Sequence, residues 1–221
     1  MAIWLSPGGN NPGIFGTHAM LSSMNCIFVD WHGVLSADRF WHSLPPDSGA
    51  WPCIDALFAD QQLIDRWMLG QVRSAEVIRE AFPTEIQTEM LASLLRDCRT
   101  MRIDQELLHG LDVLTAQADF FIATDNMDCF ADSIHSRPEI ALFDDVLCSC
   151  RLGALKSSTA EFFGPTLAAK NSTWSQALLI DDDHANCEHF RRQGGTAIRF
   201  RSSDQALGEA GKWLKERTAH R

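Results

Sequence analysis

The chain has 221 residues, of which 45% are hydrophobic and 22% charged, and its formal net charge is −10. This length is sufficient for a complete α/β core with a smaller inserted domain. The acidic balance argues against non-specific binding of nucleic acid, and no apolar run reaches the about 18 residues of a membrane span. The seven cysteines lack paired C-x-x-C spacing and no signal-peptide pattern is present, so we expect reduced thiols in a cytoplasmic protein.

The beginning of the chain is unlike the interior of a helix or strand. Residues 8–13 read Gly-Gly-Asn-Asn-Pro-Gly, and Gly, Pro, Asn and Ser are frequent throughout this stretch. We therefore expect residues 1–23 to form a flexible N-terminal extension.

The first apolar run, Cys26 to Val29, is short and continuous, which is typical of a strand that is covered on both faces. Asp30 is the residue immediately after this run. Ligands of an open parallel sheet bind beyond the carboxyl ends of the strands, so we expect Asp30 at a ligand site. Trp31 and Trp41 are close to Asp30 in sequence, and we expect both rings in the substrate pocket.

A long helical pattern separates this strand from the next one. Thr84 to Gln87 resembles a capping box, and the apolar residues after it repeat at helical spacing. We expect a small helical domain over residues 36–102. Its hinges would lie near Gly33 to Ser36 and near Arg102 to Glu106.

Two further apolar runs, Phe120 to Ala123 and Ala177 to Ile180, are also typical of buried strands. Helical stretches separate the runs, which favours a parallel sheet. Thr124 follows the first of these runs, and Asp181-Asp182 end the second.

Between these runs, Lys156 lies in a Gly-x-x-Lys context before a helical stretch. A carboxylate, a hydroxyl, an ammonium and a carboxylate pair at one edge of a sheet suit the transfer of an anionic group around a divalent cation. Asp183, the third of the acidic residues, is expected to cap the helix that follows.

In this order and strand context, Asp30 to Leu35, Thr124, Lys156 and Asp181-Asp182 resemble the four motifs of the haloacid dehalogenase superfamily. The resemblance covers most of the chain. It implies an α/β fold with a three-layer, Rossmann-like core and a mainly parallel sheet, over residues 24–35 and 103–221. It also implies that residues 36–102 form an all-helical cap inserted after the first strand.

The resemblance implies covalent catalysis, in which Asp30 attacks the substrate and water hydrolyses the aspartyl intermediate. Thr124 would bind a phosphoryl oxygen, and Lys156 would offset negative charge. The expected ligands of Mg²⁺ are Asp30, the backbone carbonyl of His32, Asp182 and Asp181. The expected substrate contacts are Thr124, Asp125, Asn126, Lys156, Trp31 and Trp41.

His32 is the departure from the family pattern, because phosphatases of the family usually carry a second aspartate at this position as general acid and base. Histidine transfers protons near neutral pH, so His32 is a catalytic candidate, although a neighbouring cation disfavours its protonated form. The dehalogenases of the family also lack the second aspartate. They work without a metal, however, and generally lack the acidic pair.

The sequence therefore predicts a Mg²⁺-dependent hydrolase, most directly a phosphatase of a small phosphorylated metabolite. One alternative is a metal-independent hydrolase of carbon–halogen or carbon–nitrogen bonds through an aspartyl ester. Another is a catalytically silent binding protein with the same fold. We expect a small-molecule substrate and neither nucleic acid nor membrane as a partner; a homodimer is the commonest form of oligomer, and no sequence feature bears on it.

Overall fold

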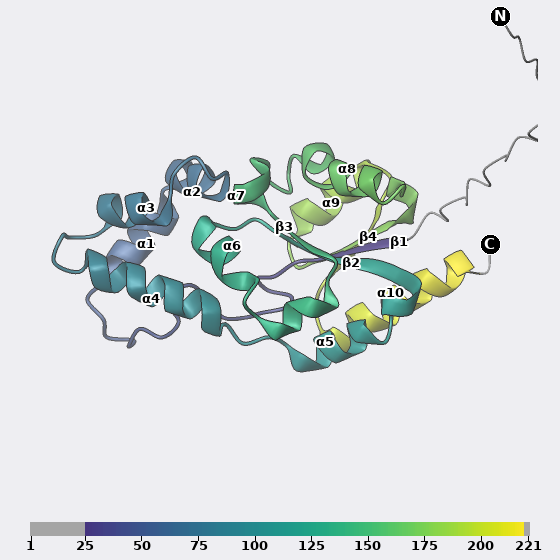
Figure 1. Cartoon of the computed structure of the whole chain (residues 1–221), viewed down its shortest axis with the longest axis horizontal. Coiled ribbons are helices and arrows are strands. Elements are labelled where there is room, and N and C mark those ends of the chain that lie inside the picture. The colour runs from purple at the N-terminus through teal and green to yellow at the C-terminus, as the bar shows by residue number, and fades with distance from the viewer. Residues whose placement is uncertain (1–24, 219–221) are drawn as a thin grey trace, which may run out of the picture.

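The computed structural model describes residues 25–218, so the expected N-terminal extension lies outside the described residues. The centre of the fold is a parallel five-stranded sheet (Figure 1). Its strands lie in the order β3-β2-β1-β4-β5. The α/β class and the parallel sheet predicted from the apolar runs are confirmed. The strands are β1 (Asn25–Val29), β2 (Ala118–Thr124), β3 (Asp145–Cys148), β4 (Ala177–Asp181) and β5 (Thr196–Arg199).

Helices cover both faces of the sheet and complete three layers. Side chains alternate along β1, so that Ile27 and Val29 join one hydrophobic cluster and Cys26 and Phe28 the other. The first cluster includes residues of α5 (Gln105–Asp112), α6 (Asp128–Ile134) and α10 (Ser203–Thr218). The second includes residues of α8 (Thr159–Ala169) and α9 (His184–Arg192). The short elements are α7 (Ser149–Leu152) and the 3₁₀ turns η1 (Thr115–Gln117), η2 (Pro138–Leu142) and η3 (Trp174–Gln176).

Of the five α-helices between β1 and β2, the four that precede α5 gather at the end of the molecule away from α10 (Figure 1). Met90 and Leu94 are buried, in agreement with the predicted apolar face. The predicted capping box is wrong, because α4 begins only at Gln87 and the Gln87 side chain donates instead to the carbonyl of Phe82 at 2.8 Å. We call this unit, residues 36–102, the helical insertion; its helices are α1 (Trp51–Ala59), α2 (Gln61–Met68), α3 (Ser74–Ala81) and α4 (Gln87–Thr100).

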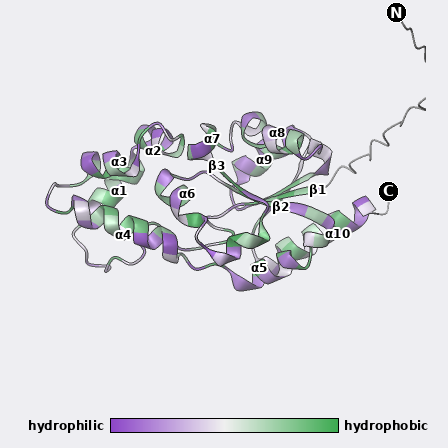
Figure 2. Cartoon of the chain, in the orientation of Figure 1, coloured by the Kyte–Doolittle hydropathy of each residue, from purple (hydrophilic) through white to green (hydrophobic). Residues whose placement is uncertain are grey.

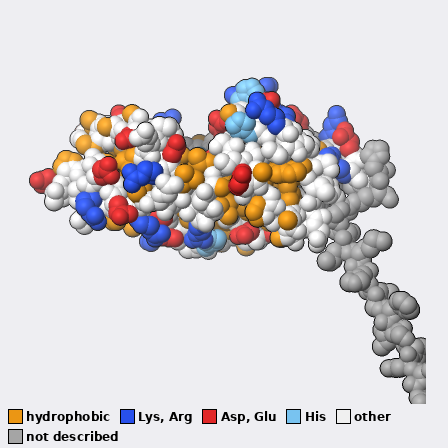
Figure 3. All heavy atoms as spheres, turned by 90° about the horizontal axis from the view of Figure 1, so that it is seen from above, with side chains coloured by type: hydrophobic (Ala, Val, Ile, Leu, Met, Phe, Trp, Pro, Cys, Tyr) orange, Lys and Arg blue, Asp and Glu red, His pale blue; other side chains and the backbone are white. Residues whose placement is uncertain are grey.

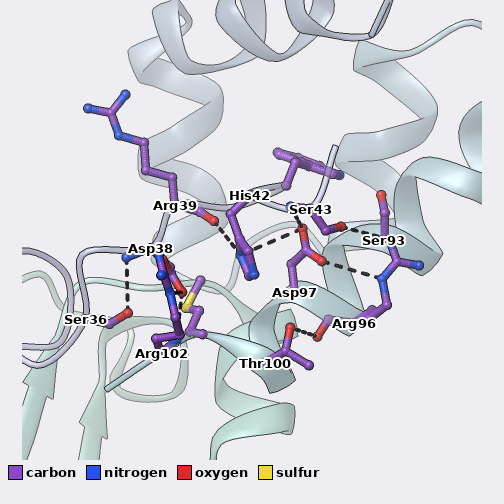
Figure 4. Close-up of polar contacts among 12 residues, drawn as sticks. Ser36, Asp38, Arg39, His42, Ser43, Ser93, Arg96, Asp97, Thr100 and Arg102 are labelled. Carbon is purple, nitrogen blue, oxygen red and sulfur yellow. Dashed lines mark hydrogen bonds and ion pairs between the residues drawn. The ribbon is translucent and has the colours of Figure 1, made fainter. Parts of the chain in front are cut away.

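The two connections between the insertion and the sheet run side by side. The backbone N–H of Asp104 donates to the carbonyl of Leu35 at 2.9 Å. The guanidinium of Arg102 donates to the carboxylate of Asp38 at 2.7 Å, as the close-up in Figure 4 shows. Both contacts lie next to the segments where the sequence predicts the hinges.

A second contact joins the insertion to α6. Asp128, the first residue of α6, accepts hydrogen bonds from the indole of Trp67 and from the backbone N–H of Ser74, both at 3.0 Å. Trp67 is fully buried and Asp128 is only 8% exposed. The insertion is therefore attached to the core through a buried carboxylate as well as through its connections.

The surface is mixed in character. Figure 2 shows hydrophobic and hydrophilic residues interspersed along the helices, and Figure 3 shows charged side chains among small apolar groups on one face. In that view the outline is notched between the helical insertion and the rest of the molecule (Figure 3). Within residues 25–218, no helix combines the length and the apolar character that a membrane span requires.

Candidate active site

Asp30 lies at the carboxyl end of β1 and is only 6% exposed. Its backbone N–H donates to the carbonyl of Ile180, on the neighbouring strand, at 2.9 Å, and this bond fixes the residue at the edge of the sheet. One carboxylate oxygen accepts from the N–H of Trp31 at 2.7 Å. Burial raises the pKa of the Asp30 carboxyl, while the nearby Lys156 acts in the opposite direction.

Lys156 joins two carboxylates in the interior. Its Nζ lies 2.9 Å from Asp30 and 2.7 Å from Asp181, and the side chain is 3% exposed. Burial alone lowers the pKa of Lys156, but the carboxylates of Asp30 and Asp181 outweigh burial and hold that pKa above its usual value. The ammonium is therefore charged at neutral pH.

The segment that carries Lys156 is held by hydrogen bonds at both ends of the residue. The backbone N–H of Lys156 donates to Asp125 at 2.9 Å, and its carbonyl accepts from the hydroxyl of Thr159 at 3.1 Å. Asp125, which the sequence places in contact with the substrate, thus has one oxygen committed to positioning Lys156. Burial raises the pKa of the Asp125 carboxyl.

The carboxylates of Asp181, the last residue of β4, and of Asp182, which follows it, have different surroundings. Asp181 is fully buried, and its oxygens accept from Lys156 and, at 2.8 Å, from the N–H of Asp183. The amide of Asn186 lies 3.3 Å from the same carboxylate. Asp182 is exposed. Asp182 is accordingly better placed than Asp181 to offer an oxygen to a cation, while Asp181 holds Lys156.

The carboxylates of Asp30, Asp181 and Asp182 fit a divalent cation. Each offers one oxygen, and these oxygens lie within 4.8 Å of one another. A few carboxylate oxygens completed by water are the ligands that Mg²⁺ prefers. The backbone of Gly33, at φ +80°, approaches the same place so closely that a Cβ there would overlap the carboxylate of Asp182.

Thr124 and Asn126 extend the site along the end of β2. Thr124 is 1% exposed, and its hydroxyl accepts from the amide of Asn126 at 3.4 Å. Asn126 is fully buried, and its backbone N–H donates to the hydroxyl of Ser149 at 2.9 Å. The structure places Asn126 behind Thr124 and next to His32, where it supports other side chains.

His32 is half-buried, with Nδ1 3.4 Å from the amide nitrogen of Asn126. Burial lowers the pKa of His32 to about 4, and Lys156 acts in the same direction. The ring is therefore neutral at pH 7. This agrees with the expectation that a nearby cation disfavours its protonated form.

Two hollows have His32 among their lining residues. The acidic hollow has a volume of about 390 Å³, and Asp30, Thr124, Asp125 and Lys156 are among the residues that line it. The aromatic cavity is larger, about 690 Å³, and lies between the first connection and α1.

Trp31 and Trp41 do not line either hollow, and the expectation that they contact the substrate is wrong. Both are fully buried, with Trp31 donating to Met101 Sδ at 3.3 Å and Trp41 donating to the carbonyl of Met90 at 2.9 Å. Their rings fill the core beneath the insertion.

The aromatic residues that line the cavity are Phe40, Trp51 and Phe58. None of these three was among the expected substrate contacts. Trp51 and Phe58 lie on α1, and no local pattern distinguishes them from core residues.

Solved structures with a similar fold were found, although the chain matches no protein-family model and no curated protein. A predicted HAD-like family hydrolase from Porphyromonas gingivalis has a TM-score of 0.56 at 18% identity, over 80% of this chain and 91% of the other. A HAD family enzyme from Bacteroides thetaiotaomicron, in complex with magnesium and inorganic phosphate, has a TM-score of 0.57 at 13% identity, over 80% of this chain and 94% of the other. A 2-haloacid dehalogenase from Pseudomonas syringae has a TM-score of 0.60 at 14% identity, over 87% of this chain and 99% of the other.

The chain therefore has the α/β fold of haloacid dehalogenase-like hydrolases, as the four motifs predict. At these identities the comparison establishes the fold and leaves the chemistry to the side chains of this chain. The similar structures include both an enzyme with bound magnesium and phosphate and a dehalogenase, so the fold alone does not select a substrate.

Proposed function

We propose that this chain is a Mg²⁺-dependent hydrolase of the haloacid dehalogenase superfamily that removes phosphate from a small phosphorylated molecule. The observation that carries the proposal is the position of Lys156 between Asp30 and Asp181, with Asp182 beside them. This arrangement combines a carboxylate nucleophile with a buried cation and a group of oxygen ligands.

The net negative charge of the site favours a cation-dependent reaction over the metal-independent alternative. Among residues 25–218, a single ammonium, that of Lys156, pairs with the carboxylates of this site. Such an environment repels a phosphate unless a divalent cation joins it. When bound, Mg²⁺ would supply positive charge to the phosphoryl oxygens, with Asp30, Asp182 and the carbonyl of His32 as its proposed protein ligands.

In the proposed mechanism, a carboxylate oxygen of Asp30 attacks phosphorus, and the bond between phosphorus and the ester oxygen breaks, releasing the alcohol after protonation by water. Water then hydrolyses the aspartyl phosphate, which releases inorganic phosphate and restores the carboxylate. The hydroxyl of Thr124 donates to a phosphoryl oxygen, and Lys156 offsets the charge that develops on the transferring group. Such contacts act by positioning and electrostatics. The helical insertion acts as a cap that shields the reaction from water.

The absence of a carboxylate at position 32 keeps the alternative of an aspartyl-ester hydrolase open. That reaction needs no metal, so metal dependence separates the two proposals. A silent binding protein with this fold would bind ligand without turnover.

The test is phosphate release from a panel of phosphomonoesters, with Mg²⁺ or with chelator, by the parent protein and by Asp30→Asn. We expect Mg²⁺-dependent release that the substitution abolishes. Release that persists in Asp30→Asn would overturn the nucleophile. No release from any ester, together with turnover of a haloacid in chelator, would overturn phosphatase activity in favour of the metal-independent reaction.

A further inference from the structure

Two thiols lie against each other where strand β3 ends. Cys148 is the last residue of β3, and Cys150 is the second residue of α7. Both are free thiols, and their sulfurs are 3.5 Å apart. A disulfide bond between them therefore needs an approach of only about 1.5 Å between two atoms that are already in contact.

The two thiols differ in burial and in acidity. Cys148 is 1% exposed, whereas Cys150 is half-buried. A hydrogen bond from the Cys148 thiol lowers the pKa of the Cys150 thiol, although burial acts in the opposite direction. The same pairing, together with burial, raises the pKa of the Cys148 thiol. Cys150 is therefore the more accessible residue and ionises more readily, while Cys148 keeps its proton.

Cys148 is connected to the segment that carries Thr124. The two residues are register partners on the neighbouring strands β3 and β2. The Cys148 thiol also has the carbonyl of Asn126 as an acceptor at 3.4 Å, and the hydroxyl of the intervening Ser149 donates to the same carbonyl at 3.2 Å. A displacement of the Cys148 sulfur would therefore disturb the segment that holds the proposed phosphate-binding hydroxyl.

Cys150 lies against the helical insertion. Helix α7 is beside α2, as Figure 1 shows. The backbone of Gly70, shortly after α2, has φ +70° and approaches the carbonyl of Cys150 so closely that a Cβ would overlap it. The thiol pair thus contacts the site segment through one residue and the insertion through the other.

We propose that Cys148 and Cys150 form a reversible disulfide bond when a hydroperoxide is present, and that this bond lowers activity by displacing residues 124–126. Disulfides in reducing compartments are usually transient and redox-sensing, which suits a pair of this kind. Formation of the bond does not depend on the proposed phosphatase function, whereas its effect on turnover rests on that function.

The reaction with hydrogen peroxide proceeds in two steps. The Cys150 thiolate attacks one peroxide oxygen, the O–O bond breaks, and a sulfenic acid forms with release of hydroxide. The Cys148 sulfur then attacks the sulfenic sulfur, the S–O bond breaks, and the departing hydroxide takes the Cys148 proton and leaves as water. The proton that Cys150 gave up neutralises the first hydroxide. The two sulfurs lose two electrons together, and the peroxide is reduced to water.

The bond should change activity more than stability. The oxidised pair has no hydrogen left to donate to Asn126, and Cys148 is drawn toward α7. Misplacement of a positioning group by about 1 Å can cost about 10²-fold in rate, so we expect kcat/KM to fall by about 10- to 100-fold on oxidation. Closing a loop of so few residues removes little entropy from the unfolded chain.

The bond is tested on the full chain by peptide mapping after hydrogen peroxide treatment and alkylation of the remaining thiols. Cleavage before each aspartate gives a peptide of residues 145–180, in which Cys148 and Cys150 are the only cysteines. We expect this peptide to be unalkylated and lighter by two hydrogens, and to be doubly alkylated after treatment with dithiothreitol. A peptide that stays fully alkylated while Cys53 is oxidised, or that carries sulfinic acid without a disulfide, would overturn the proposal.

Cys150→Ser removes the proposed thiolate and keeps a small polar side chain, so no bond should form. Cys53→Ser removes another half-buried thiol, on α1, and is the matched control. Peroxide should lower phosphate release by the parent and by Cys53→Ser, dithiothreitol should restore it, and Cys150→Ser should resist. Equal losses in Cys150→Ser and the parent would place the sensitive group elsewhere. A bond that forms without a change in kcat/KM would overturn its effect on the site and leave the phosphatase proposal intact.

Hydrogen exchange provides a measurement that needs no turnover. Oxidation should speed exchange of the backbone amides of residues 124–127 and 68–74 in the parent, and should leave Cys150→Ser unchanged. If the reduced protein releases no phosphate from any ester, the phosphatase proposal fails by itself, and this change in exchange still supports the thiol pair. Unchanged exchange in both segments despite the bond would overturn the proposed displacement.

Discussion

The ammonium of Lys156 lies 2.7 Å from the carboxylate of Asp181, which is fully buried and is the last residue of strand β4. Asp181 thus holds Lys156 in place, and Lys156 in turn contacts the proposed nucleophile Asp30 at 2.9 Å. The adjacent Asp182 is left to face the solvent side of the site. The three residues therefore have separable roles, which substitutions can distinguish.

Replacing Lys156 with Met should abolish most activity and also destabilise the fold. Loss of a single electrostatic contact to the transferring group typically costs about 10²- to 10³-fold in kcat. Removing one member of a buried ion pair leaves uncompensated carboxylates, at about 3–5 kcal/mol. Urea unfolding and kcat measured on the same samples check both effects; a variant with unchanged unfolding midpoint would contradict the buried ion pair.

Replacing Asp182 with Asn should raise the Mg²⁺ concentration needed for half-maximal activity, because the substitution removes the most accessible carboxylate of the proposed metal site. Titration of activity with Mg²⁺ provides the measurement. Asp183→Asn removes a neighbouring charge but keeps a residue that can cap α9, so its half-maximal concentration should change far less. Equal changes in the two variants would indicate a general charge effect and no specific ligand.

Aryl esters should show a burst of phenol release followed by slower turnover. Nδ1 of His32 faces the amide nitrogen of Asn126 and Nε2 is buried, so no base at position 32 reaches the water that hydrolyses the aspartyl phosphate. Stopped-flow measurement should give a burst close to one equivalent of enzyme. His32→Asp supplies a carboxylate and should reduce the burst and increase steady-state turnover; a linear time course in the parent would show that hydrolysis of the intermediate is not slow.

Much of the fold, and the position of three proposed site residues at strand ends, follow from the sequence because they depend on local patterns. The runs that became β1, β2 and β4 are continuous and apolar, and Asp30, Thr124 and Asp181 lie at or next to the ends of these strands. Asp183 caps α9 as predicted, since its carboxylate accepts from the N–H of Asn186 at 2.9 Å. These features need only strand periodicity and capping rules.

The features that the sequence does not reveal depend on contacts between distant segments. Trp31 contacts Met101 and Trp41 contacts Met90, so nearness to Asp30 in the chain placed these two rings wrongly. Asn126 contacts His32, which lies far from it in the sequence, so no local pattern shows that it supports this side chain. Strand β3 begins with a charged residue, Asp145, and has only three apolar residues in succession, too few for an apolar run to be recognised.

Stability should fall in acid when the pair between Asp38 and Arg102 is lost. Hydrogen bonds from the guanidinium of Arg102 lower the pKa of the Asp38 carboxyl to about 2 in the folded protein. In the unfolded chain that pKa returns to about 4, so the unfolded state binds the proton more readily. The stabilisation is complete above about pH 4 and is lost as the pH falls toward about 2.

Urea midpoints of the parent and Asp38→Asn between pH 2 and pH 7 test this relationship. The parent should be more stable at neutral pH, and the difference should shrink as the pH approaches 2. The effect should be modest and should weaken in high salt, because the side chain of Arg102 is 88% exposed. A difference that stays constant across this pH range would show that Asp38 acts through packing and its neutral hydrogen bonds, and that its charge does not hold the two connections of the insertion together.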